Sequence, residues 1–313
     1  MCRFARVDVL PRHDYSTRDY LTCRVRDEGT VDLNQIFKTA NPAIGVVHLL
    51  PLPTSPRWQG DLHSVLARAE QEATALASGG VHGLIVENFF DAPFAKSQVD
   101  PAVVSAMTIV VQRLSQLVPL PIGLNVLRND ACSALAIAAC TGAKFIRVNV
   151  LSGVMATDQG LIEGDAHRLM RYRRELGVDI NILADVLVKH AQPLGRPSVT
   201  TAVQDTIHRG LADGIIISGA ATGHAPTVED LTQAKEAAGD TPLFIGSGAS
   251  IDNIAHLIPA ADGVIVSSSL KRKGRIEQPV DPIRTRQFMT AMAQGLITRS
   301  LGRSAANHSM ALN

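Results

Sequence analysis

Aromatic residues are scarce in this chain: phenylalanine, tryptophan and tyrosine together make up 4% of its 313 residues. Base stacking depends on such rings, and a formal net charge of +1 provides no basic surface, so the composition argues against nucleic-acid binding. No apolar run approaches the length that spans a bilayer. The N-terminal residues mix arginine with acidic residues and lack the apolar core of a secretory signal. We therefore expect a globular cytoplasmic protein without a transmembrane segment.

Cysteine is also rare, and its spacing shows no metal-binding pair. The four cysteines are Cys2, Cys23, Cys132 and Cys140. The last two fall in an alanine-rich run predicted to be helical, where cysteine usually behaves as a small apolar side chain. This pattern fits a reducing compartment and makes a disulfide framework or a zinc module a poor interpretation.

Apolar strand-like segments alternate eight times with helix-like segments over most of the chain. The expected strands lie at 44–53, 83–90, 121–130, 145–153, 180–184, 214–223, 242–250 and 263–274. Parallel strands need helical crossovers, so this alternation predicts a single (β/α)8 TIM barrel of the α/β class. A doubly wound open sheet is the alternative, but no G-x-G-x-x-G follows the first strand. We expect an irregular N-terminal arm at 1–35, the barrel at 36–298 and a disordered C-terminal tail at 299–313.

Polar side chains follow the expected strands at the ends that form the mouth of a barrel. The set comprises His48, Glu87, Asn125, Asn149, Asp185, Ser218 and Ser247, with Arg128 and Lys189 reaching in from loops. Buried polar groups cost about 1–3 kcal/mol each unless they are paired. A stable barrel does not need such a ring, so we interpret it as a functional site rather than a structural network.

The last two strands are each followed by small residues of the kind that bind phosphate. The candidate phosphate-binding residues are Ser247, Gly248, Ala249, Ser268 and Ser269. Glycine lets an anion approach the backbone, and strands seven and eight are where many barrels hold a phosphate. The segment from Ser218 to Gly223, which includes Thr222, either closes over the same ligand or forms a plain turn.

A metal site and a Schiff base are the less favoured chemical alternatives. His48, Glu87, Asp185 and His190 offer nitrogen and oxygen ligands for a divalent metal, but none lies at helical H-x-x-x-H spacing. A lysine desolvated in a barrel mouth can lose its proton and attack a carbonyl. Lys189 lies beyond its strand, however, so contact with a substrate anion fits it better. We expect no resident cofactor.

Several long motifs resemble one known family. They are GVVHLLPLP, ENFFDAPF, PIGLNVLRNDACSALAIAACTGAKFIRVNV, ILADVLVKHA and DGVIVSSSLK. Together they resemble the BtpA/SgcQ family over about residues 36–295, which implies a ribulose-phosphate-binding type of barrel. Known members of that family include a cyanobacterial factor required for photosystem I accumulation and a protein encoded beside sugar-uptake genes. The family pattern falls on His48, Glu87, Asn88, Asp91, Asn125, Arg128, Asn129, Asp130, Arg147, Asn149, Asp185, Lys189 and His190. The chain departs from it at Ser267, where the family pattern has glycine.

These observations predict an enzyme that acts on a phosphorylated sugar or ribosyl compound, of the isomerase, lyase or glycosyl-bond-processing type. Glu87 and Asp185 would be its acid and base, and His48 an electrophile or second proton carrier. The predicted substrate-binding residues are Asn88, Asn125, Arg128, Asn149, Lys189, Ser218 and Thr222. The rival interpretation is a non-catalytic assembly or stability factor; either protein could form a homo-oligomer. We expect neutralisation of Glu87 or Asp185 to remove ligand binding and leave the fold intact.

A truncation tests the assignment of the N-terminal arm. Deletion of residues 1–30 should leave a barrel that unfolds cooperatively, because that segment has no apolar periodicity and should bury little surface. Thermal denaturation followed by circular dichroism measures this. An insoluble truncated protein, or one that no longer melts cooperatively, would show that the arm belongs to the core or to a subunit contact.

Overall fold

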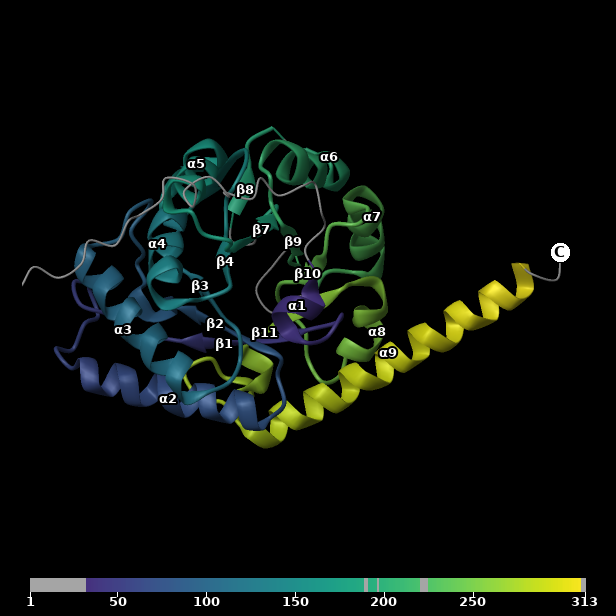
Figure 1. Cartoon of the computed structure of the whole chain (residues 1–313), viewed down its shortest axis with the longest axis horizontal. Coiled ribbons are helices and arrows are strands. Elements are labelled where there is room, and N and C mark those ends of the chain that lie inside the picture. The colour runs from purple at the N-terminus through teal and green to yellow at the C-terminus, as the bar shows by residue number, and fades with distance from the viewer. Residues whose placement is uncertain (1–31, 189–190, 196, 220–224, 311–313) are drawn as a thin grey trace, which may run out of the picture.

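Eight parallel strands close into a barrel (Figure 1). The computed structural model describes residues 32–310 except 189–190, 196 and 220–224. The strands follow one another around the barrel in the order β1-β11-β10-β9-β7-β4-β3-β2. They are β1 (Ala43–His48), β2 (Gly83–Glu87), β3 (Ile122–Asn125), β4 (Phe145–Val148), β7 (Asn181–Val186), β9 (Gly214–Ile217), β10 (Leu243–Ile245) and β11 (Gly263–Val266). The predicted TIM barrel is confirmed, although every strand except β7 is shorter than expected.

Helices cover the outside of the barrel and carry the chain from one strand to the next. They are α2 (Leu62–Ser78), α3 (Pro101–Leu117), α4 (Ala131–Thr141), α5 (Ala166–Leu176), α6 (Val199–Gln204), α7 (Val228–Ala238), α8 (Ile254–Leu257) and α9 (Pro282–Met310). Short helical turns add η1 (Phe89–Asp91), η2 (Asp205–Arg209), η3 (Ile258–Ala260), η4 (Ser268–Leu270) and η5 (Arg272–Gly274). Asp61 caps α2 by accepting from the backbone N–H groups of His63 and Ser64. Within the described ranges, no helix has both the length and the apolar character needed to cross a membrane.

The interior of the barrel is filled by an apolar layer that every second residue of the strands supplies. The layer consists of Ile44, Val46, Ile85, Phe145, Leu183, Ile216, Phe244 and Ile265. Two large rings fit because glycine stands on the neighbouring strand. A side chain at Gly123 would collide with the ring of Phe145, and a Cβ at Gly263 would lie 2.6 Å from Phe244 Cε1. The apolar layer forms the floor beneath the candidate site.

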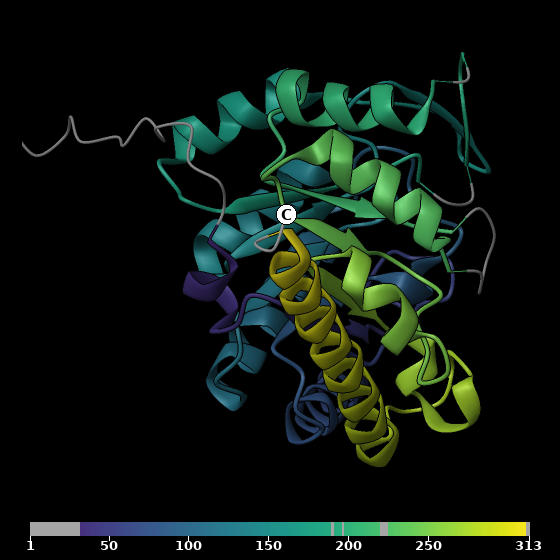
Figure 2. The ribbon, with the colours of Figure 1, turned by 90° about the vertical axis from the view of Figure 1, so that its right-hand side faces the viewer.

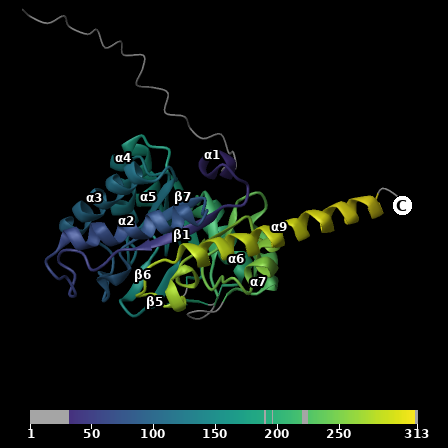
Figure 3. The same cartoon turned by 90° about the horizontal axis from the view of Figure 1, so that it is seen from below.

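A short helix closes the amino-terminal end of the barrel. Helix α1 (Leu33–Phe37) starts at Asp32, whose carboxylate accepts from the N–H of Asn34. Leu33 and Phe37 are buried in the interior cluster, and the ring of Phe37 meets that of Phe145 edge-on with centroids 5.3 Å apart. Figure 3 shows α1 at the opposite end of the barrel from β5 and β6. The expected irregular arm through residue 35 therefore differs from the structure, because one pair of apolar residues four positions apart was too short a pattern to predict a helix.

A second, three-stranded sheet lies beside the mouth in a region that the sequence predicted to be loops. Strands β5 (Val154–Thr157), β6 (Gly160–Glu163) and β8 (Ala191–Pro193) pair in the order β6-β5-β8, all antiparallel. The β5–β6 turn depends on Gly160, which has a φ of +91°, and on a bond from the Thr157 hydroxyl to the Gly160 carbonyl. Met155 and Ile162 give the sheet its small apolar face. Strands of three or four residues with so few apolar side chains carry little sequence signal.

The last helix extends well past the barrel. Figures 1 and 2 show α9 beside α8 and then projecting away from the remaining helices. It reaches Met310, so residues 299–310 are helical where we expected a disordered tail. The physical reason is propagation: these residues contain no proline, and extending an existing helix avoids the unfavourable nucleation step.

A buried ion pair ties the end of the barrel to α2. Lys271, which follows η4, has no exposed surface, and its Nζ lies 2.8 Å from both carboxylate oxygens of Glu72. Arg68, one turn earlier in α2, donates from Nε to Glu72 Oε1 at 2.8 Å. Burial lowers the pKa of Lys271, and the Glu72 carboxylate acts against that shift. The pair holds the segment that leaves β11 in a fixed position.

Removing one partner of this pair should destabilise the protein strongly. Glu72→Met should lower the free energy of unfolding by about 3–5 kcal/mol, because the Lys271 ammonium stays buried without an anion. The double variant Glu72→Met/Lys271→Met should recover most of that loss, since neither charge remains. Chemical denaturation measures both values.

A matched control lies in the same helix. Glu70 pairs with Arg113, whose side chain is 64% exposed, so Glu70→Met should cost less than about 1 kcal/mol. Equal losses for Glu70→Met and Glu72→Met, or a double variant as unstable as the single one, would contradict the structural role of the Lys271 pair.

Candidate functional site

A polar layer lies directly above the apolar floor of the barrel. Side chains alternate along a strand, so the residue two positions beyond an interior residue also points inward. On β1, Val46 is followed by His48, and on β2, Ile85 is followed by Glu87. The full layer contains His48, Glu87, Asn125, Arg147, Asp185, Ser218 and Ser267. The strand ends thus bring together most of the side chains that the sequence singled out.

Arg147 and Asp185 form a buried ion pair at the centre of one side of this layer. Arg147 donates from Nε to Asp185 Oδ2 and from a terminal nitrogen to Oδ1, both at 2.9 Å. Asn149 donates from Nδ2 to Asp185 Oδ2 at 2.8 Å. Burial acts to lower the pKa of Arg147, but Asp185, with a contribution from Glu87, raises it above its ordinary value. Arg147 is therefore a permanent cation, and Asp185 is held by three donated hydrogen bonds.

Glu87 and His48 form a second group on neighbouring strands. Asn125 Nδ2 donates to Glu87 Oε2 at 3.0 Å, and Glu87 Oε1 lies 4.0 Å from His48 Nε2. The His48 ring stacks on Phe89, with centroids 4.5 Å apart and an interplanar angle of 29°. Ser267 places its hydroxyl 3.3 Å from His48 Nε2. A carboxylate and an imidazole at this separation can each exchange a proton with one bound molecule.

Asn88 holds loops together, although the sequence assigned it to substrate binding. Its Oδ1 accepts from the Leu127 N–H at 2.7 Å, and its Nδ2 donates to Asp91 Oδ2 at 3.0 Å. Asp91 in turn accepts from the Leu52 N–H at 2.7 Å. Burial raises the pKa of Asp91, while the hydrogen bonds from Leu52 and Asn88 act against the rise. This network joins the segments that leave β1, β2 and β3.

The loop after β3 is fixed in a similar way. Asn129 donates from Nδ2 to the Val150 carbonyl and accepts from the Val150 N–H, both at 2.9 Å. Asp130 caps α4 by accepting from the Ser133 N–H at 3.0 Å. Arg128, between β3 and this cap, is 9% exposed and lies at the carboxyl end of the barrel, as predicted.

Three buried polar atoms of the site have no hydrogen-bond partner in the described part of the chain. They are Asn149 Oδ1, Ser218 Oγ and Ser247 Oγ. Ser218 lies close to the next strand, since a Cβ at Gly246 would be 2.7 Å from its hydroxyl. An unpaired buried polar group costs about 1–3 kcal/mol. A ligand that forms hydrogen bonds with these atoms would remove this free-energy cost, and binding would be favoured by that amount.

The loops after β10 and β11 lie against each other at the predicted phosphate site. The Ser269 hydroxyl donates to the Ala249 carbonyl at 2.8 Å, which joins the two loops. Gly248 has a φ of +75°, a conformation that favours glycine. Among the described residues, no acceptor takes a hydrogen bond from the backbone N–H groups of Gly248, Ala249, Ser268 or Ser269. The following helix α8 begins at Ile254 and has only four residues, so it adds little to the site.

Some predicted residues cannot be placed. Lys189, His190 and Thr222 lie outside the described residues. Among the described residues, no three histidine, cysteine, aspartate or glutamate side chains are arranged to hold a metal ion. The free thiol of Cys132 is half-buried, whereas that of Cys140 is exposed instead of packing as a small apolar group.

The match to a family model covers residues 39–294 and is described as the BtpA family. The chain belongs to the BtpA family. It is 71% identical to the photosystem I biogenesis protein BtpA of Synechocystis sp. over 85% of this chain and 93% of that protein. It is 46% identical to a protein of Thermococcus kodakarensis over 79% of this chain and 94% of that one. The predicted family resemblance is thus confirmed.

A solved structure supports the fold. Tryptophan synthase from Mycobacterium tuberculosis superposes with a TM-score of 0.55 at 16% sequence identity, covering 84% of this chain and 99% of that one. At that identity the likeness concerns the barrel architecture alone.

Two contacts were not predicted from the sequence. Arg147 received no role, because an arginine inside a strand gives no sign of the partner it will meet on another strand. Ser267 was noted only as a departure from the family pattern, but its hydroxyl lies beside His48. Its position at an inward-facing register, two residues beyond Ile265, was the available signal.

The ion pair with Arg147 changes the expectation for Asp185. Asp185→Asn should lower the free energy of unfolding by about 3–5 kcal/mol, because a buried guanidinium loses its counter-ion. Glu87→Gln should cost clearly less than Asp185→Asn, since the new amide oxygen still accepts from Asn125 and Arg147 keeps Asp185 as its counter-ion. Urea denaturation of the two variants measures the difference. Similar losses of stability for both variants would contradict the distinction between Asp185, which pairs with Arg147, and Glu87, which lies beside His48.

Proposed function

We propose that this chain is an enzyme that binds a phosphorylated sugar or ribosyl compound at the barrel mouth and transfers protons on it. The observation that carries the proposal is the set of unpaired buried atoms, Asn149 Oδ1, Ser218 Oγ and Ser247 Oγ, in the segments that follow β4, β9 and β10. A scaffold gains nothing from such atoms, whereas a ligand with several hydroxyl or N–H groups can bond all of them. The ring of charged groups beside them supplies the chemistry.

Glu87 and His48 carry the proton transfer in this proposal. Each lies at the end of its strand, and Nε2 of His48 is 4.0 Å from Oε1 of Glu87, which leaves a substrate atom within reach of both. One takes a proton from a carbon next to a carbonyl or from a sugar hydroxyl, and the other returns a proton to an oxygen. Both isomerisation and cleavage of a glycosyl bond use such a pair. Phe89 fixes the imidazole plane by stacking.

Arg147 and Asp185 orient the substrate and set the charge of the site. The pKa of Arg147 is raised above its ordinary value by the neighbouring carboxylates, so its charge persists through the reaction. A fixed cation stabilises negative charge that develops on a sugar oxygen or an enolate. Asp185, held by Arg147 and Asn149, is positioned to accept a hydrogen bond from a sugar hydroxyl.

The phosphate occupies the loops after β10 and β11. Four backbone N–H groups there meet no acceptor among the described residues, and Gly248 gives an anion access to the backbone. The hydroxyl of Ser267 lies 3.3 Å from Nε2 of His48. The serine that stands where the family pattern has glycine therefore adds a polar contact to the imidazole. Lys189 and Thr222 stay candidates for further ligand contacts.

A second function is favoured by one relative. The protein of Synechocystis sp. that is 71% identical to this chain is named for photosystem I biogenesis, so an assembly or stability role is the rival proposal. The two differ in what they require of the mouth. A non-catalytic factor tolerates Glu87→Gln without loss of its role, whereas the enzyme proposal makes this carboxylate essential.

Calorimetric titration with ribose 5-phosphate and with inorganic phosphate tests the ligand class. The parent protein should bind both, and Gly248→Val should abolish binding, because a β-branched side chain at a positive φ displaces the backbone from the anion. Gly177→Val is the matched control. Its φ is +64°, but it ends α5 at the opposite end of the barrel, so it has similar backbone strain and should bind normally.

Two outcomes count against the proposal. If ribose 5-phosphate does not bind the parent protein at millimolar concentration, the proposal of a phosphorylated sugar ligand is wrong. Equal affinity of Gly248→Val and the parent would place the anion elsewhere.

A further inference from the structure

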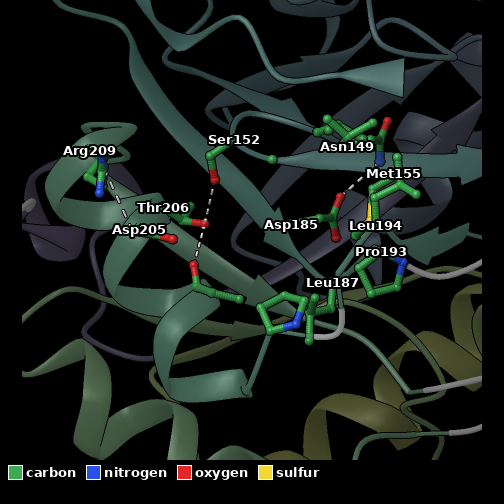
Figure 4. Close-up of a pocket in the computed structure, with 15 residues that line it drawn as sticks. Asn149, Ser152, Met155, Asp185, Leu187, Pro193, Leu194, Asp205, Thr206 and Arg209 are labelled. Atoms are coloured by element: carbon green, nitrogen blue, oxygen red, sulfur yellow. Dashed lines mark hydrogen bonds and ion pairs between the residues drawn. The ribbon is translucent and has the colours of Figure 1, made fainter. Parts of the chain in front are cut away.

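A cavity of about 200 Å3 adjoins the polar layer on the side of β4 and β7 (Figure 4). Asp185 belongs to both the polar layer and the cavity wall, and Asn149, which donates to it, also lines the cavity. The cavity reaches from them beneath the second sheet to Thr206 in η2. It therefore extends the mouth sideways, away from the loops after β10 and β11.

The walls of this cavity near Asp185 are mainly apolar. They include Val150, Val154, Met155, Leu187, Pro193 and Leu194. Polar residues line the far end of the cavity and interact with one another there: Ser152 with Thr206, and Arg209 with Asp205. Figure 4 shows Met155, Leu187, Pro193 and Leu194 gathered around Asp185 and Asn149. A sugar phosphate gains nothing from the apolar part of this wall. A bound molecule that fills the cavity must bring an apolar part.

The size limits that apolar part. An apolar cavity of about 150 Å3 can hold benzene. A cavity of about 200 Å3 therefore accepts one planar ring with small substituents. Met155 gives the wall a flexible thioether that packs well against a ring.

One polar atom specifies what the ring must carry. Asn149 donates from Nδ2 to Asp185 at 2.8 Å, so its amide cannot turn over without bringing Oδ1 against the carboxylate. Oδ1 is thereby held in the cavity wall as an acceptor, buried and without a partner among the described residues. The ring has to provide an N–H or O–H donor to satisfy it.

We propose that this cavity is the subsite for a single planar ring bearing an N–H donor, linked to the sugar phosphate of the proposed substrate. The proposal rests on the proposed function and names the substrate class more closely: a 5-phosphoribosyl group joined to one aromatic or heterocyclic ring. The phosphate lies at β10 and β11, the sugar lies over the polar layer, and the ring lies at β4 and β7. Strands β10 and β7 are two steps apart in the barrel order, and adjacent strands are about 4.8 Å apart, so the near edges of the two ends are roughly 10 Å from each other, a span that such a compound covers.

Calorimetry with three probes tests the subsite. Uridine 5′-monophosphate and nicotinamide mononucleotide each carry one ring with an N–H donor, and ribose 5-phosphate carries none. At least one of the ring compounds should bind about tenfold or more tighter than ribose 5-phosphate.

Two exposed leucines of the second sheet provide matched variants. Leu194 is 57% exposed and borders the cavity, whereas Leu161 is 46% exposed and does not. Leu194→Asp should remove the additional affinity that the ring compounds have over ribose 5-phosphate. It should leave the affinity for ribose 5-phosphate itself unchanged. Leu161→Asp should change neither affinity. Ala202→Phe, which fills the cavity from α6, should repeat the effect of Leu194→Asp.

The outcomes separate the two proposals. If ribose 5-phosphate binds and no ring compound binds tighter, the subsite is overturned and the proposed function stands. If Leu194→Asp weakens both kinds of probe equally, the cavity is not a ring site. If none of the probes binds the parent protein, the proposed function falls and the subsite falls with it.

Discussion

A guanidinium buried inside a barrel needs anions around it, and Arg147 imposes this requirement on the whole mouth. Its charge would be unfavourable above an apolar floor without Asp185, which accepts two hydrogen bonds from it at 2.9 Å. Glu87 adds to the negative field, since it too raises the pKa of Arg147. The carboxylates on β2 and β7 are therefore parts of one electrostatic arrangement, and Asn125 and Asn149 fix their orientation.

The same arrangement separates the roles of the two carboxylates. Asp185 receives two donors from Arg147 and one from Asn149, whereas Glu87 receives a hydrogen bond from Asn125 and lies beside His48. A carboxylate fixed by a permanent cation is suited to accept hydrogen bonds from the hydroxyl groups of a substrate. A carboxylate beside an imidazole suits proton transfer. Substrate recognition and chemistry then lie on different strands of one polar layer.

Much of this fold could be predicted from the sequence, because the alternation of strands and helices is long and regular. The strand-end residues were found for the same reason: the register of a closed barrel places His48, Glu87 and Asp185 at one level. The pairings among them could not be found, since Arg147 and Asp185 are 38 residues apart and only the closed sheet brings them together.

Short elements were missed for a different reason. Helix α1 has five residues, and the strands of the second sheet have three or four, so neither shows a full period of apolar spacing. Yet α1 fills one end of the barrel, and the second sheet covers the cavity beside Asn149. The part of the site that decides which ring a ligand carries therefore depends on the segments with the weakest sequence signal.

A crystal structure with ribose 5-phosphate bound tests the central claim most directly. The account predicts the phosphate within hydrogen-bond distance of the backbone N–H groups of Gly248 and Ser268, and the sugar carbon farthest from it between Glu87 and Asp185. A phosphate bound anywhere else, or a sugar that contacts neither carboxylate, would contradict the assignment of this mouth as a sugar-phosphate site.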